Sequence, residues 1–294
     1  MIINEVREAS NKELRTLKIL NEIRNLPSIP KVMFEVTKIL KNNSTSTYEL
    51  IGAISKDQGL TTKILAVANS PFYGLQRRVS SLEFAIMVLG NEEIKSIVIA
   101  LSLSGAIKIE SSENFNYNDF WYHSLVVGSA AKEIARYLGH LDIATDAFIG
   151  GMLHELGIQV MYKYFPNEYN EIAERAKTEN SDFADLENEI LGMTHEKMGR
   201  FLAEKWGLPE ELSDAIGNHH QPGLSKGNNL IPAIVHLADY MTQKFGIAKF
   251  FWDENYKLEE ELYTIFDFDS REALEEFINN HEEVFMEAAS ESQT

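Results

Sequence analysis

The decisive stretch of this 294-residue chain lies near its middle and reads Phe148-Ile-Gly-Gly-Met-Leu-His-Glu-Leu-Gly157. Apolar residues and glycines surround an adjacent histidine and glutamate, His154 and Glu155. Neighbouring residues of an α-helix project about 100° apart, so both side chains can converge on one site against a helical core. Because glycine has no Cβ atom, it lets neighbouring helices approach closely. The stretch therefore predicts packed helices around a polar pair.

Helical periodicity continues through the rest of the chain. Apolar residues recur at helical spacing in Val32, Val36 and Ile39–Leu40, and again in Leu50 and Ile54. Alternating apolar and polar residues, the mark of a half-buried strand, are nearly absent between turn residues. We therefore predict an all-α fold with more than about ten helices and no substantial sheet.

Capping signals divide this pattern into short helices. Ser80 followed by Glu83 predicts a capping box at a helix start. Gly90 is suited to end that helix, and Asn91 can begin the next one at once. Pro30 is expected near another helix start, where its missing N–H costs little. Further boundaries are predicted at Gly139, Gly157, Gly207, Pro166 and Pro209.

The composition and charge exclude several function classes. The 45 acidic residues outnumber the 27 basic ones, for a net charge of −18, which disfavours binding to nucleic acid or to an anionic membrane. The absence of cysteine excludes disulfides, thiolate catalysis and cysteine-ligated metal. The longest apolar stretch, residues 97–107, is shorter than the roughly 20 residues of a membrane span. Since residues 1–15 are too charged for a signal peptide, we predict a cytoplasmic protein.

The histidines are the candidate chemical groups. Imidazole nitrogens and carboxylate oxygens bind Zn, Fe or Mn, and a bridging carboxylate can hold two ions. Asp119 precedes His123 by one helical turn, and His154 adjoins Glu155. A single histidine in an apolar helix is more commonly structural, so spacing alone leaves a metal site and a metal-free cluster both open. The five candidates are His123, His154, His195, His219 and His220; His140 and His281 are assigned to the surface, and His236 to the core or a supporting position.

Several stretches together resemble a known family. Residues 26–33, 54–74 and 79–90 resemble the opening of an HDOD domain, and residues 148–157 resemble its central motif. The similarity runs over residues 20–245, so the chain is identified as a member of this family. HDOD proteins are all-helical bacterial regulators related to the HD and HD-GYP metal-dependent phosphohydrolases. The resemblance implies an HD-like helical bundle and a role in signal transduction.

The resemblance also implies an organisation and a ligand set. We expect an N-terminal helical lobe over residues 1–110, an HD-like lobe over 111–245 and an acidic helical extension over 246–294. The extension has 14 acidic and two basic residues after position 252, and it either packs on the body or binds a partner. Asp119 would match the extra carboxylate of some HD-GYP sites. The implied ligands of one or two Fe, Mn or Zn ions, meeting in one cavity, are His123, His154, Glu155, His195, His219, His220 and Asp239.

Three departures from the related hydrolases bear on activity. Glu155 stands where those enzymes carry aspartate, and Ile158 and Gln159 follow Gly157 where a lysine is expected. No Gly-Tyr-Pro loop follows Pro222. In the relatives that lysine and loop serve the cyclic dinucleotide, so we predict no appreciable cyclic-di-GMP hydrolysis.

Two functions are compatible with these observations. The first is a non-catalytic regulatory module that retains an HD-type metal site and docks other signalling proteins. The second is a metal-dependent phosphohydrolase acting on a nucleotide or cyclic dinucleotide. A basic pocket would discriminate between them, because phosphates need nearby cations. The candidate cations are Lys63, Arg77, Arg78, Lys197 and Arg200.

Overall fold

The computed structural model describes residues 2–23, 28–40, 47–75, 77–179, 181–225, 227–250, 252 and 256–291. Helices dominate this part of the chain, and its one β-type pairing is an isolated bridge between Ser112 and Phe115. The all-α prediction with more than ten helices is therefore confirmed. Within the same residues, no helix combines the length and apolar character that crossing a bilayer requires. Leu26 and Pro27, which open the first family-like stretch, lie outside the described residues.

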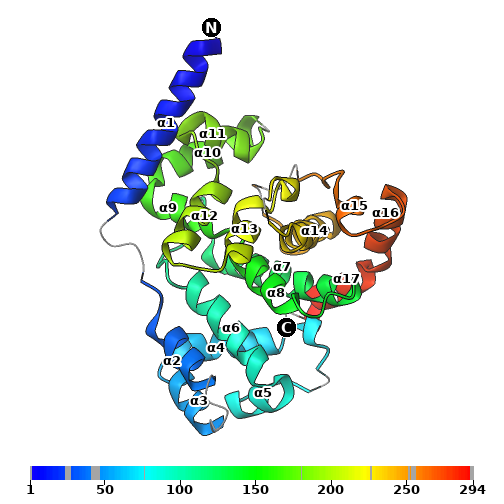
Figure 1. Ribbon diagram of the computed structural model, residues 1–294. Coiled ribbons are helices and arrows are strands. Elements are labelled where there is room, and N and C mark those ends of the chain that lie inside the picture. Colours follow the sequence, from blue (N-terminus) through cyan, green and yellow to red (C-terminus); the bar gives the residue numbers. More distant parts are fainter. Residues whose placement is uncertain are drawn as a thin grey trace.

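Six short helices form the first part of the body, at the bottom of Figure 1. Ile64 and Ile97 are fully buried there, as α4 packs on α6. The elements are α2 (Lys31–Leu40), α3 (Thr47–Ile54), α4 (Gln58–Ala68), the 3-10 helix η1 (Pro71–Tyr73), α5 (Leu82–Leu89) and α6 (Asn91–Ser104).

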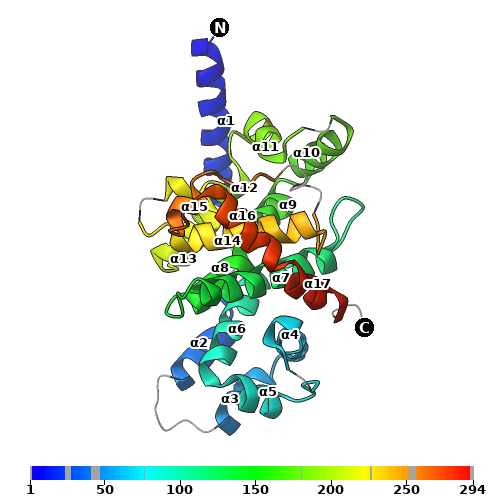
Figure 2. The ribbon, with the colours of Figure 1, turned by 90° about the vertical axis from the view of Figure 1, so that its right-hand side faces the viewer.

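The second part surrounds α8, which contacts α6 on one side and α14 on the other (Figures 1 and 2). Helices α7 and α8 approach closely because glycines meet at their crossing: a Cβ atom on Gly151 would lie 2.7 Å from the Cα atom of Gly128. The elements are α7 (Tyr117–Tyr137), α8 (Ala144–Leu153), α9 (Leu156–Tyr164), α10 (Pro166–Glu179), α11 (Phe183–Leu191), α12 (His195–Lys205), α13 (Glu210–Asn218), the 3-10 helix η2 (Pro222–Leu224) and α14 (Leu230–Phe245).

The first helix departs from the expected division of the chain. Helix α1 (Ile2–Glu22) was expected in the N-terminal lobe but packs on α11 of the second part. The Thr16 hydroxyl donates to the Leu191 carbonyl at 2.8 Å, and the Lys12 ammonium donates to the Glu189 carbonyl at 2.6 Å. Its N-terminal end projects beyond α10 and α11 in both side views (Figures 1 and 2).

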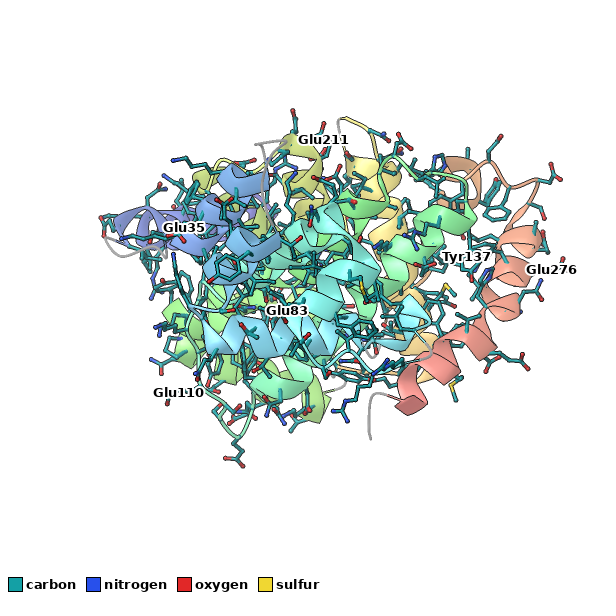
Figure 3. The ribbon with its side chains drawn as sticks, turned by 90° about the horizontal axis from the view of Figure 1, so that it is seen from below. Glu35, Glu83, Glu110, Tyr137, Glu211 and Glu276 are labelled. Atoms are coloured by element: carbon teal, nitrogen blue, oxygen red, sulfur yellow. The ribbon has the colours of Figure 1, made fainter. Side chains whose placement is uncertain are left out.

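The acidic extension packs on the body. Its helices are α15 (Leu262–Ile265), α16 (Arg271–Asn280) and α17 (Glu282–Glu291). Leu274, Ile278 and Phe285 are buried, and the Phe285 ring meets Phe72 of η1 edge to face. The acidic side chains of α16 are exposed, and Glu276 points outward in Figure 3. Of the two alternatives for this segment, the structure thus shows packing.

Most of the predicted helix boundaries hold. Pro30 precedes α2, Gly90 ends α5 at a φ of 84°, and Asn91 begins α6. Positive φ values at Gly139 and Gly207 follow the ends of α7 and α12. Pro166 begins α10, and Pro209 caps α13.

Two predicted boundaries are wrong. The cap of α5 is Ser81 and not Ser80, because the Ser81 hydroxyl accepts from the Phe84 N–H at 3.2 Å. Gly157 does not end a helix but lies in the first turn of α9. Packing at this position requires a residue without a side chain, because a Cβ atom on Gly157 would lie 1.7 Å from the His195 carbonyl oxygen.

Candidate metal centre

The structure brings all seven predicted ligands together where six helices meet. His123 comes from α7, the His154–Glu155 pair joins α8 to α9, and Asp239 comes from α14. His195 is the first residue of α12, and the His219–His220 pair follows α13. Apart from the half-buried His220, these residues are at most 2% exposed. Their role as metal ligands stays a prediction.

One part of this cluster comprises His123, His154 and Asp239. The Nε2 atoms of the two histidines are 3.2 Å apart, and His123 Nε2 is 3.6 Å from an Asp239 oxygen. Each Nδ1 atom faces a carbonyl oxygen, that of Ala248 at 3.0 Å for His123 and that of Gly151 at 2.6 Å for His154. A carbonyl only accepts, so both Nδ1 atoms carry the proton and two Nε2 lone pairs face each other.

The other part comprises His195, His219 and His220. His195 Nε2 lies 3.0 Å from His220 Nε2 and 3.4 Å from the Glu155 Oε2 atom, which places Glu155 beside this group. His219 repeats the pattern of the first part, because its Nδ1 atom faces the Ile216 carbonyl at 2.9 Å. In each of the two parts the candidate ligand atoms all lie within 4.8 Å of one another.

Burial sets the protonation of these groups. It lowers the pKa of His123 to about 4 and the pKa values of His154, His219 and His220 well below their ordinary value, so these imidazoles are neutral near pH 7. Burial also raises the pKa of Glu155 to about 7 and that of Asp239 well above its usual range, although the neighbouring His195 opposes both shifts. Neutral imidazoles are the form that binds metals.

Unpartnered atoms at the centre of the cluster fit a cation. Among the described residues, Glu155 Oε2, His219 Nε2 and Asp239 Oδ2 are buried with no hydrogen-bond partner. A buried acceptor without a donor costs about 1–3 kcal/mol. A divalent ion bound to such an atom would supply the missing partner, so the residues present fit a metal.

Several residues at the cluster were missed by sequence reasoning. Trp252 donates its indole N–H to Glu155 Oε1 at 2.6 Å, and the Tyr256 hydroxyl donates to the His219 carbonyl at 3.1 Å. Both come from the acidic extension, where the sequence gives no sign of the site. Glu187 accepts from His195 at 3.0 Å. Burial alone would lower the pKa of His195, but its carboxylate neighbours, with Glu187 first, raise that pKa well above its ordinary value.

The other candidate residues named from the sequence differ in how far they are buried. Asp119 is exposed, although it lies one turn before His123, so its predicted match to an extra carboxylate ligand is wrong. His236 is buried and supports the cluster, because its Nδ1 atom lies 2.7 Å from the His219 carbonyl. His140 and His281 lie outside the cluster and are half-buried rather than fully at the surface.

A cavity of about 520 Å³ reaches the cluster at His195 and His220. Lys197, Arg200 and Lys257 supply positive charge to its walls. Arg200 is itself paired with Glu204 and Asp214. The other predicted cations lie elsewhere: Lys63 donates to Tyr117, Arg77 stacks on Phe84, and Arg78 lines a separate cavity.

The family profile of the HDOD domain matches residues 26–222, about two thirds of the chain. The chain belongs to the HDOD family. Asp239, Trp252 and Tyr256 lie beyond the matched residues, so the HDOD helices and the segment after them build the cluster together.

Solved structures share the fold over nearly the whole chain. An HDOD domain protein of unknown function from Geobacter sulfurreducens has a TM-score of 0.74 at 21% identity, covering 95% of this chain and 97% of that one. A proposed phosphohydrolase from Shewanella amazonensis SB2B has a TM-score of 0.66 at 21% identity, covering 93% and 97%. A proposed signal transduction protein from Marinobacter aquaeolei VT8 has a TM-score of 0.70 at 19% identity, covering 97% and 66%. Likeness at this identity shows the fold alone.

An uncharacterised protein of Treponema pallidum (strain Nichols) is 24% identical over 202 residues. The aligned region covers 69% of this chain and 39% of that protein. The chain thus spans about two fifths of the length of the curated relative it matches.

Proposed function

We propose that this chain is a regulatory HDOD module of signal transduction that binds a divalent transition metal through the cluster and does not use it for hydrolysis. The observation that carries the metal site is the set of three unpartnered buried atoms on Glu155, His219 and Asp239. Fe, Mn and Zn suit this mixture of imidazole and carboxylate ligands. Other signalling proteins are the partners we propose for such a module.

Two observations favour a non-catalytic role. One side of the cluster is covered, since Trp252 bonds to Glu155 and the Phe250 ring packs edge to face against His123. The positions after Gly157, where the related hydrolases carry a lysine, hold Ile158 and Gln159, which are buried and uncharged. A phosphate group bound beside the cluster would find no cation at residues 158 and 159.

The second candidate function is a metal-dependent phosphohydrolase, and the cavity beside His195 and His220 favours it. Its volume suits a small-molecule ligand, and Lys197 and Lys257 could each contact a phosphate. A metal ion bound at the cluster would supply Lewis acidity toward a phosphoryl oxygen. His195 and His220 line this cavity and would face such a substrate.

Ligand variants test the metal site. We expect Mn²⁺ or Zn²⁺ added to metal-free protein to raise its melting temperature, because an ion that binds the native state stabilises it. Asp239→Asn, which keeps the shape of the side chain, should abolish most of this shift. His140→Ala, outside the cluster, is the matched control and should keep it. Equal shifts in all three proteins would contradict binding at the cluster.

An assay of the metal-loaded protein separates the two functions. The non-catalytic role predicts no appreciable turnover of cyclic-di-GMP. Turnover near 1 s⁻¹, about the low end of typical enzymes, would favour the hydrolase instead. Loss of that turnover in His154→Ala would assign it to the cluster and exclude a contaminating enzyme.

A further inference from the structure

The carboxylate of Glu187 approaches His195 from the Nδ1 edge of its ring. Both carboxylate oxygens lie 3.0 Å from His195 Nδ1, and one also accepts the His195 main-chain N–H at 2.9 Å. Glu187 is fully buried on α11. One side chain therefore holds both the backbone and the ring of His195 at the start of α12.

The hydrogen-bond pattern separates Glu187 from the candidate ligands. An ionised carboxylate only accepts, so His195 Nδ1 must carry a proton, and any lone pair on the ring lies on Nε2. That Nε2 atom is the one that faces Glu155 and His220. Glu155 and Asp239 each retain a buried oxygen without a donor, whereas no oxygen of Glu187 is in that state. Glu187 thus acts on His195 and not on the centre of the cluster.

Three other histidines of the cluster are oriented by weaker acceptors. Main-chain carbonyls bond to the Nδ1 atoms of His123, His154 and His219. A carboxylate on the outer nitrogen of a metal-bound imidazole makes the inner nitrogen more basic and fixes the ring. Among these four histidines, the orientation of His195 is consequently the most firmly set.

We propose that Glu187 is a positioning residue of the metal centre, which holds His195 with Nε2 directed at the ion. The effect of Glu187 on metal affinity rests on the proposed metal binding. The placement of the proton on His195 Nδ1 does not, because it applies to the metal-free protein as well. Neither the family motifs nor the spacing of the histidines points to this residue.

Affinity measurements on matched variants test the proposal. Glu187→Gln keeps the volume but replaces one acceptor oxygen with an NH₂ group, so we expect Zn²⁺ to bind about 10–100-fold more weakly, as measured by competition with a chelator. Glu189→Gln, on the exposed side of the same helix, should bind like the wild type. A folded Glu187→Gln protein with wild-type affinity would overturn the proposal.

Nitrogen NMR of the His195 ring gives a second readout that does not depend on metal binding or on a variant that folds. Metal-free wild-type protein should show a hydrogen-bonded Nδ1–H with slowed exchange. A ring protonated on Nε2 alone would overturn the proposal. If the wild type bound no metal yet showed the Nδ1–H signal, the proposed function would fail while the positioning of His195 by Glu187 stood.

Discussion

At the scale of single residues, the cluster depends on a glycine that contributes no side chain to it. Gly157, in the first turn of α9, lies against the backbone of His195 and close to Gly199 of α12. This contact sets how closely α12 approaches α9, and His195 is the residue at the point of contact. The sequence indicates close packing around this glycine, but not which helix approaches it, because that partner lies about forty residues further along the chain.

Replacing this glycine should therefore disturb both stability and the cluster. A Cβ atom at residue 157 would lie 1.7 Å from the His195 carbonyl oxygen and 2.5 Å from its carbon, so α12 must move. We expect Gly157→Ala to lower the free energy of unfolding by about 3 kcal/mol in urea denaturation, the upper end of overpacking effects. Gly52→Ala is the control, since nothing lies within 4 Å of its Cβ position in α3 and helix propensity favours alanine. Equal effects in the two variants would contradict the close contact.

At the scale of elements, the junction between the two parts of the body holds a buried ion pair. Lys132 of α7 pairs with Glu93 of α6, and the ammonium lies 4.9 Å from the centre of the Tyr73 ring of η1. The Tyr73 hydroxyl also donates to Glu93. Burial lowers the pKa of Lys132, and the Glu93 carboxylate opposes that shift. Three elements are thus joined through one carboxylate.

Removing one member of this pair leaves the other charge poorly compensated. Lys132→Met should lower the free energy of unfolding by about 3 kcal/mol, and Glu93→Gln added to it should recover part of that loss. Arg136→Met, which breaks the exposed pair with Glu133 on the same helix, should cost less than about 1 kcal/mol. Chemical denaturation of the three variants and the wild type measures these differences. A loss for Lys132→Met no larger than that for Arg136→Met would show that the pair does not hold the junction.

Prediction from sequence succeeded for elements whose signals are local. Gly90 and Asn91 mark a helix end and a helix start through their own backbone preferences. The cap at Ser81 was displaced by one residue because two serines precede Glu83 and sequence does not decide which one takes extended backbone. The packing of α1 on α11 had no local signal, since Thr16 and Leu191 meet only in the folded chain.

At the scale of the whole molecule, polar groups converge at the centre while most of the acidic charge faces outward. The seven candidate ligands were identified together because the family resemblance assigns them by position, and the structure gathers them. Glu187 and Trp252 were missed because their contacts with His195 and Glu155 arise from how α11 and the extension fold over the cluster. Such contacts leave no periodicity or motif in the sequence.

The central claim is that this cluster holds a metal ion, and elemental analysis of the protein as purified tests it most directly. The account predicts about one or two Fe, Mn or Zn ions per chain, lost on chelation together with a fall in melting temperature. Less than about 0.1 metal per chain, with a melting temperature unmoved by added Mn²⁺ or Fe²⁺, would contradict it. The cluster would then be a metal-free network of buried histidines and carboxylates.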